Sequence, residues 1–229
     1  MKVIRISEHI FKLETWAGIK MSAWAVKTEY GSIIIDAGLR YMGAPLLKLA
    51  EEHGPLQMIL LTHGHSDHTG GIQSILKMKK TPVYIHPEEI PYATGKSPYP
   101  GRKKKEKNVG EKLIKPLPSD EAGNMYTMMG LLPIHTPGHS PGHTVYYHER
   151  DNILIGGDLF TSRGGRLAPP ISMFTADMDE AVISGRVVKE LNPALLSITH
   201  GEDIEKPGAQ YEVYRGIYFA GRQAAVRPG

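Results

Sequence analysis

The stretch Thr62-His63-Gly64-His65-Ser66-Asp67-His68 directly follows the apolar run Gln57–Leu61. Imidazole nitrogen and carboxylate oxygen are the ligands with which proteins hold zinc and similar divalent cations. His63 and His65 are two residues apart, so an extended chain points both side chains the same way. The Asp and the last His add two more donors where the chain is expected to turn into a helix. The pattern predicts a metal site at the end of a buried strand.

Three further donors stand in comparable places downstream. His139 lies in the turn-rich sequence TPGHSPGH, Asp158 follows the run Ile153–Gly157, and His200 follows the strand-like run Leu195–Thr199. Each has a neighbouring glycine, which lets the backbone approach a crowded centre. A single His or Asp at a strand end is more often a hydrogen-bonded structural residue. Together with the first motif, however, the three residues indicate one shared metal centre.

Strand-like and helix-like runs alternate around these motifs. Strands are expected at Val3–Ser7, Ile10–Glu14, Ala23–Thr28, Ser32–Ile35, Gln57–Leu61, Pro82–Ile85, His143–Tyr147, Ile153–Ile155 and Leu195–Thr199. Helices are expected at Ala44–His53, Gly70–Lys79 and Asp179–Leu191. The alternation predicts an α/β fold in which helices cover the sheets. The stretch Tyr92–Pro118, rich in Pro, Gly and Lys, is expected to be an inserted loop. Because the candidate ligands lie on both sides of it, residues 1–229 are predicted to form a single domain.

Composition excludes several classes of site. The chain of 229 residues has no cysteine, which excludes disulfides, thiolate metal sites, iron–sulfur clusters and a cysteine nucleophile. A net charge of +3 does not call for a nucleic acid partner. The N-terminus lacks the apolar region of a signal peptide, and the chain lacks a run long enough to span a membrane. We therefore expect a soluble cytoplasmic protein without a membrane partner.

The ordered set of donors resembles the metallo-β-lactamase superfamily, from about Ile33 to Gly201. The resemblance implies a four-layer αβ/βα sandwich with a metal centre at one sheet edge. It implies two divalent metal ions, with zinc expected and manganese or iron as alternatives. It also implies a role for each residue. One metal would be bound by His63, His65 and His139, the second by Asp67, His68 and His200, with Asp158 bridging them and Asp36 orienting ligands from behind.

The same resemblance implies a hydrolase. A hydroxide shared by the two ions would attack a carbonyl carbon or phosphorus, and Asp67 would take up the released proton. Without a cysteine ligand, the set looks more like glyoxalase II and the acyl-homoserine lactonases than like a β-lactamase. A small-molecule ester, thioester or lactone is therefore the expected substrate. Gly157–Phe160 followed by Gly165-Arg166 is similar to glyoxalase II, in which a basic residue holds a substrate carboxylate, so Arg166 is predicted to bind substrate.

Two other activities compete with this interpretation. Persulfide dioxygenases resemble the same superfamily but bind one iron through the equivalents of His63, His139 and Asp158. A phosphodiesterase or nuclease finds support only in the basic run Arg102–Lys107, which is otherwise expected to be a solvated loop or a lid that attracts anionic substrates.

Two features outside the ligand set also lead to expectations. His9 and His148 border strands and are expected to be exposed. The aromatic segment Tyr211–Phe219 either joins an interface, as in a homodimer, or caps the fold.

Overall fold

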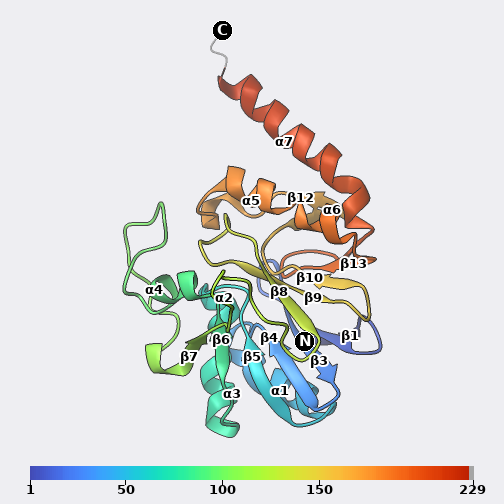
Figure 1. Ribbon diagram of the computed structural model, residues 1–229. Coiled ribbons are helices and arrows are strands. Elements are labelled where there is room, and N and C mark those ends of the chain that lie inside the picture. The colour runs from blue at the N-terminus through green and yellow to red at the C-terminus, as the bar shows by residue number, and fades with distance from the viewer. Residues whose placement is uncertain (227–229) are drawn as a thin grey trace.

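The structure is a computed structural model and describes residues 1–226. Two β-sheets form its centre (Figure 1). The first sheet runs in the order β1-β2-β3-β4-β5-β6-β7, antiparallel as far as β4 and parallel from β4 to β7. Its strands are β1 (Lys2–Arg5), β2 (Ile10–Trp16), β3 (Lys20–Thr28), β4 (Gly31–Ile35), β5 (Leu56–Leu60), β6 (Val83–Ile85) and β7 (Ile114–Pro116).

The second sheet has the order β14-β13-β10-β9-β8, and only β10 and β13 pair in parallel. Its strands are β8 (Leu131–His135), β9 (Thr144–His148), β10 (Ile153–Ile155), β13 (Leu195–Ser197) and β14 (Ile204–Glu205). A separate hairpin joins β11 (Thr161–Arg163) to β12 (Arg166–Ala168).

The helices form the two outer layers. Figure 1 shows α1 and α3 outside the first sheet and α5 and α6 outside the second, while α7 projects beyond them. The helices are α1 (Gly43–Glu51), α2 (Ser66–Thr69), α3 (Ile72–Met78), α4 (Ile90–Ala93), α5 (Met178–Ser184), α6 (Val187–Leu191) and α7 (Tyr211–Val226). None of the described helices is long and apolar enough to cross a bilayer.

The alternation of side chains along β3 explains this layering. Ala23 and Ala25 belong to the core shared with α1 and α3, where small side chains let the helices approach the sheet. Trp24 and Val26 point to the opposite face and belong to the core between the two sheets. The Nε1 of Trp24 donates a hydrogen bond of 2.8 Å to Oγ of Ser197 on β13, so a polar contact also links the sheets. The predicted four-layer sandwich is confirmed.

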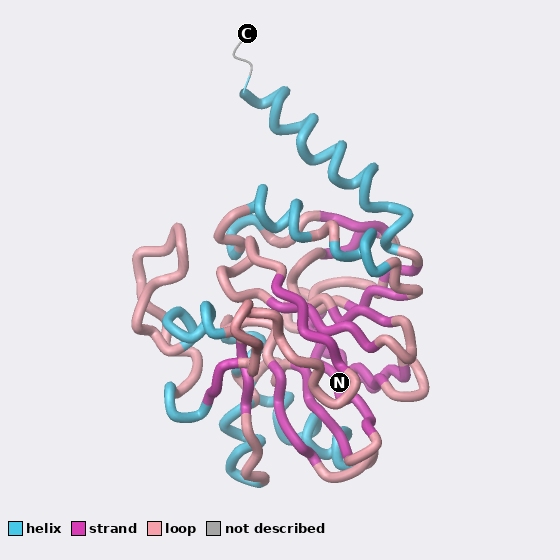
Figure 2. The backbone as a smooth tube through the Cα atoms, viewed as in Figure 1, coloured by secondary structure: helices cyan, strands magenta, loops and turns pink. Residues whose placement is uncertain are grey.

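Several segments differ from expectation. The predicted helix Asp179–Leu191 is two helices, α5 and α6, which are separated at Gly185 and Arg186, where the N–H of Arg186 bonds to the carbonyl of Ile183, three residues earlier. The strand β8 was not expected, and the Tyr211–Phe219 segment is the start of the long helix α7. The stretch Tyr92–Pro118 contains the edge strand β7, although Figure 2 shows that the part after α4 is mainly loop.

The carboxyl ends of four strands meet at one edge of the sandwich. β4 ends before Asp36, β5 before the Thr62–His68 stretch, β10 before Asp158 and β13 before His200. Within each sheet the strands concerned are parallel, so their carboxyl ends lie at the same edge. The turns Thr62–His65 (THGH) and Thr199–Glu202 (THGE) therefore follow strands of different sheets but lie at the same edge of the sandwich.

Candidate metal centre

Three imidazoles meet at the start of the site. The Nε2 of His63 lies 2.9 Å from Nδ1 of His65, and the Nε2 of His139 lies 3.1 Å from the same Nδ1. All three side chains are buried. His139 reaches the group because Gly138 has a φ of +126° and packs against the backbone of Ala181, where a Cβ would come within 2.1 Å of the amide nitrogen. Three nitrogens thus converge on one point, as in a metal site.

A second group lies beside the first. The Oδ2 of Asp67 is 3.3 Å from Nε2 of His200 and 3.6 Å from Nε2 of His68. Asp67 lies in the first turn of α2, which begins directly after His65. Its side chain is 30% exposed, against 0% for His68 and 6% for His200, so this carboxylate is the part of the group that faces solvent.

Asp158 lies between the two groups. Its Oδ2 is 3.4 Å from Nε2 of His139 and 3.2 Å from Nε2 of His200, and its Oδ1 is 3.3 Å from Nε2 of His68. The structure therefore brings together all seven of the residues that the sequence singled out as ligands.

Asp36 lies behind this arrangement and contacts it through hydrogen bonds. Its Oδ2 accepts a 2.7 Å hydrogen bond from Nδ1 of His68, which leaves Nε2 directed at the cluster. Its Oδ1 accepts from the backbone N–H of Thr62 at 2.8 Å. Asp36 has a φ of +57°, a conformation that Asp tolerates better than most residues. A carboxylate that orients a ligating His in this way fixes its ring.

Glu89 is a second buried carboxylate that forms hydrogen bonds to the ligand loops, and the sequence analysis did not predict it. It follows β6 in a short 3-10 helix, Pro87–Glu89, and is fully buried. Its oxygens accept four hydrogen bonds, which tie the His63–His65 loop to the His139 loop. The donors are the N–H of Gly64 at 3.0 Å and the hydroxyl of Tyr99, the hydroxyl of Ser140 and the N–H of Gly142, each at 2.8 Å.

His143 supports the bridging carboxylate. Its Nε2 accepts a 3.2 Å hydrogen bond from the backbone N–H of Asp158, and its Nδ1 lies 2.9 Å from Oγ1 of Thr136. Burial lowers the pKa of His143 to about 3. A neutral ring at this place can accept from the Asp158 backbone, so His143 is a positioning residue at neutral pH.

The six histidines in and around the cluster fall into two groups, one with lowered and one with raised pKa values. Burial lowers the pKa of His65 to about 4 and holds the pKa values of His63 and His139 well below 6.5. His200 is different: burial lowers its pKa, but Asp158 and Asp67 outweigh burial and raise it to about 10. The pKa of His68 is raised in the same way, since Asp36 and Asp158 outweigh its burial.

Asp67 is ionised at neutral pH. Burial raises its pKa, but the charge of His68 and the hydrogen bond from His200 outweigh burial and lower the pKa to about 2. The site therefore contains anionic carboxylates beside three neutral imidazoles, those of His63, His65 and His139, and these are donors that a divalent cation favours.

Arg166 lies outside this cluster. It is exposed on β12 and lines a groove together with residues of α7, and none of the seven candidate ligands lines that groove. Of the basic run Arg102–Lys107, in contrast, Arg102 reaches the site: its Nη2 lies 3.3 Å from Nε2 of His65. The sequence indicated the run but did not identify which of its residues faces the cluster.

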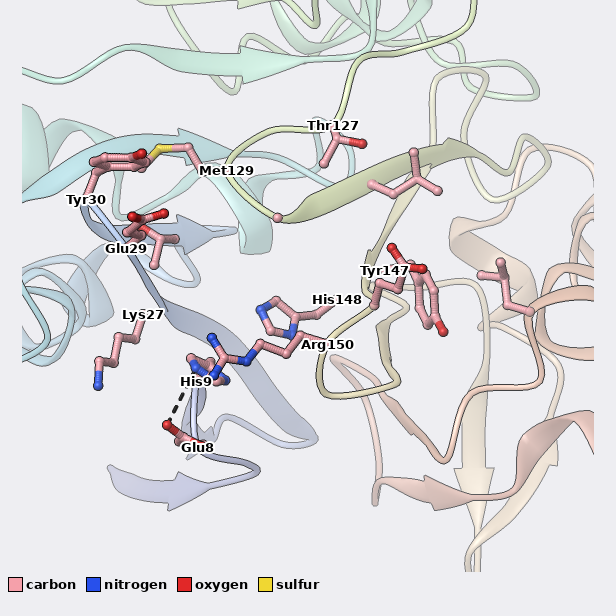
Figure 3. Close-up of a pocket in the computed structure, with 15 residues that line it drawn as sticks. Glu8, His9, Lys27, Glu29, Tyr30, Thr127, Met129, Tyr147, His148 and Arg150 are labelled. Atoms are coloured by element: carbon pink, nitrogen blue, oxygen red, sulfur yellow. Dashed lines mark ion pairs between the residues drawn. The ribbon is translucent and has the colours of Figure 1, made fainter.

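The expectation that His9 and His148 are exposed is wrong. Both are buried, and His9 Nδ1 lies 2.8 Å from Oδ1 of Asp151, which also accepts a hydrogen bond from the Ser7 hydroxyl. The two rings line a cavity of about 890 Å³ together with Lys27, Tyr147 and Arg150 (Figure 3). None of the seven candidate ligands lines it. The hydrogen bonds clamp the start of β2 to the turn after β9, which is a structural role.

Replacement of Glu89 by Gln is expected to destabilise the protein. The amide offers one acceptor oxygen in place of two and directs an NH₂ group at hydrogen-bond donors. We expect the free energy of unfolding to fall by about 3 kcal/mol in urea titrations. The exposed neighbour supplies a matched control, since Glu88→Gln is expected to change stability by less than about 0.5 kcal/mol. Equal stability of the two variants would contradict the role of Glu89.

Acid is expected to destabilise the metal-free protein. Because the folded-state pKa values of His63, His65, His139 and His143 lie below that of an unfolded His, the stability they provide is present above pH 6.5 and is lost as the pH falls toward 4. His65 alone accounts for about 2 kcal/mol between pH 7.5 and pH 5. The raised pKa values of His68 and His200 act in the opposite direction, so the stability they provide increases as the pH falls and offsets part of this loss.

Urea unfolding of chelator-treated protein at pH 7.5 and pH 5 measures this loss. A His65→Asn variant should lose less stability than the parent chain over the same interval. A metal-free protein that is as stable at pH 5 as at pH 7.5 would refute this electrostatic assignment.

Known proteins are similar to this chain in sequence and in fold. A sequence profile of the Metallo-beta-lactamase superfamily matches residues 21–200. "Probable metallo-hydrolase YybB" from Bacillus subtilis is 35% identical over 208 residues, which cover 89% of this chain and 93% of that protein. The hydroxyacylglutathione hydrolase of Aeromonas salmonicida is 29% identical over 144 residues, which cover 63% of this chain and about half (48%) of that enzyme.

A solved structure agrees with these matches. The crystal structure of TTHA1623 in a di-iron-bound form superposes with a TM-score of 0.63 and 25% identity, covering 83% of this chain and 92% of that one. The profile match and the similarity to YybB lead to one conclusion: this chain belongs to the metallo-β-lactamase superfamily and is a metallo-hydrolase by family, as its ligand pattern predicted.

Proposed function

We propose that this protein is a dinuclear metal-dependent hydrolase of a small-molecule ester, thioester or lactone. The position of Asp158 carries the proposal. One carboxylate lies within 3.4 Å of imidazole nitrogens from both ligand groups, which is the arrangement that two adjacent cations need in order to share a ligand. The likeness to a di-iron protein and to a hydroxyacylglutathione hydrolase supports the same reading.

The residues present fit such a metal pair. The Nε2 of His68 and the Oδ1 of Asp158 are buried and 3.3 Å apart, yet neither makes a hydrogen bond. Such orphaned atoms are costly unless something else satisfies them. Ligand atoms bound at about 2.0–2.1 Å around a tetrahedral ion lie about 3.3 Å from one another. The pairs in the second group, at 3.2–3.6 Å, match that spacing.

Each residue then has a defined task. His63 Nε2, His65 Nδ1 and His139 Nε2 would hold one ion, and Asp67, His68 and His200 the other, with Asp158 between them. When bound, divalent ions polarise a carbonyl oxygen and bring the pKa of a coordinated water toward 7. The ionised Asp67, at the solvent side of the cluster, would accept the proton that the attacking water loses. Asp36 and Glu89 keep the loops rigid while the charge shifts.

The second group of ligands favours this function over a mononuclear iron oxidoreductase. A single ion held by His63, His139 and Asp158 would leave Asp67, His68 and His200 without a task, although their donor atoms converge within 4.8 Å. Manganese, iron and zinc all accept nitrogen and oxygen ligands, so the cation is a separate question from the number of sites.

Metal analysis combined with a substrate panel tests the proposal. We expect two divalent ions per chain and hydrolysis of at least one member of a set of thioesters, lactones and carboxylic esters, with β-lactams and phosphodiesters as negative members. His65→Ala should lose about a thousandfold in kcat/KM, because metal catalysis supplies several kcal/mol. The control is His53→Ala, at a ring that stacks on Phe11 and shares no ligand group with the cluster.

Two results would overturn the proposal. One is a single iron per chain with no second metal, together with oxidation of a persulfide. The other is full hydrolytic activity in His65→Ala.

A further inference from the structure

Arg102 lies beside the first ligand group and borders solvent. Its Nη2 is 3.3 Å from Nε2 of His65, on the side of the ring away from the other candidate ligands. The side chain is 22% exposed, so the guanidinium borders both the site and solvent. It also lies over two aromatic rings, 5.3 Å from the centroid of Tyr99 and 5.8 Å from that of Phe174. These rings form apolar walls on which the planar group rests.

The loop that carries Arg102 is fixed to the site. Nδ2 of Asn108 donates a 2.9 Å hydrogen bond to the carbonyl of Gly64, between the first two candidate ligands. The backbone N–H of Arg102 donates to the carbonyl of Tyr99 at 3.0 Å, and the Tyr99 hydroxyl donates to Glu89. Tyr99 therefore links the backbone of Arg102 to the buried carboxylate of Glu89, which also ties the ligand loops together.

One edge of the guanidinium lacks an acidic partner. Nη1 donates to both carboxylate oxygens of Glu106, at 3.2 and 3.1 Å. Among residues 1–226, the only hydrogen-bond partner of Nη2 is His65, and Nε makes no hydrogen bond. When a metal takes Nδ1 of His65, the neutral ring carries its proton on Nε2 and cannot accept from Nη2. The Nε–Nη2 edge then has two donors without an acceptor among residues 1–226.

We propose that Arg102 is a specificity residue that binds a carboxylate of the substrate, so that the preferred substrates carry an anionic group a few atoms from the bond that is cleaved. A planar carboxylate matches two parallel donors of one arginine edge. This inference rests on the proposed function, because the anion belongs to the molecule that is hydrolysed. It assigns to Arg102 the task that the sequence had suggested for Arg166, which lies outside the cluster.

Binding of two small acids tests the proposal directly. Glutarate and pentanoate have equal chain lengths, but only glutarate has a second carboxylate to offer Arg102 once the first has reached the metals. On zinc-loaded protein we expect calorimetric titration to give a Kd for glutarate roughly tenfold to a hundredfold lower than for pentanoate. Arg102→Gln should bring the two Kd values within about twofold while leaving the Kd of pentanoate and the zinc content unchanged.

The control is Lys104→Gln, which removes one positive charge from an exposed position of the same loop. It should keep the preference for glutarate. A preference that survives in Arg102→Gln, or that Lys104→Gln removes equally, would overturn the proposal, since the loop would then act only through its overall charge. Wild-type protein that binds both acids equally would overturn it as well.

Kinetics separate this inference from the proposed function. The 4-nitrophenyl monoester of glutarate should exceed 4-nitrophenyl pentanoate in kcat/KM by roughly tenfold or more, through a lower KM, and Arg102→Gln should abolish the difference. If the wild type hydrolyses neither ester nor any other member of the panel, the hydrolase proposal fails, while the two acids still decide whether Arg102 binds a carboxylate. If both esters are hydrolysed without preference, only the Arg102 proposal fails.

Discussion

The site depends on two buried carboxylates that make no contact with solvent. Asp36 holds the His68 ring and the Thr62 backbone, and Glu89 holds the His63–His65 loop against the His139 loop. Burial of a carboxylate costs several kcal/mol unless hydrogen bonds compensate, and both residues are compensated by donors from the loops that they position. The loops and the carboxylates therefore stabilise each other, and neither arrangement would persist alone.

This mutual support holds together buried donor groups that would otherwise repel one another. Three neutral imidazoles direct their lone pairs at one point, and two carboxylates lie beside two histidines whose pKa values are raised. Without a cation, the raised pKa values favour protons on His68 and His200. Nε2 of His68 and Oδ1 of Asp158 are buried and make no hydrogen bond. Divalent ions would replace those protons and satisfy the orphaned atoms. The rigidity imposed by the two carboxylates thus produces a site ready for metal, at a cost in the stability of the metal-free protein.

The architecture and the seven candidate ligands could be predicted because their signals are local. Apolar runs that end in Asp or in Thr-His-Gly place polar donors at strand ends, and parallel strands bring those ends to one edge. The boundary between α5 and α6 was not predictable, because the apolar spacing of Ile183, Val187 and Leu191 continues across it. Glu89 follows an unremarkable Pro-Glu run, and its partners are spread from Gly64 to Gly142, so no local pattern reveals it. The burial of His9 likewise depends on Asp151, which is remote in sequence.

The resemblance to glyoxalase II predicted that Arg166 binds the substrate. In the fold, however, the arginine that lies beside His65 is Arg102. A motif near a metal ligand in sequence need not lie near it in space, and the loop after α4 varies independently of the strands that carry the ligands.

Anomalous diffraction from zinc-loaded crystals, measured on either side of the zinc absorption edge, would show whether two metals share Asp158. We predict two anomalous peaks that flank the Asp158 carboxylate, one within bonding distance of His63, His65 and His139 and the other within bonding distance of Asp67, His68 and His200. A single peak, or peaks that leave either group of ligands without a metal, would contradict it.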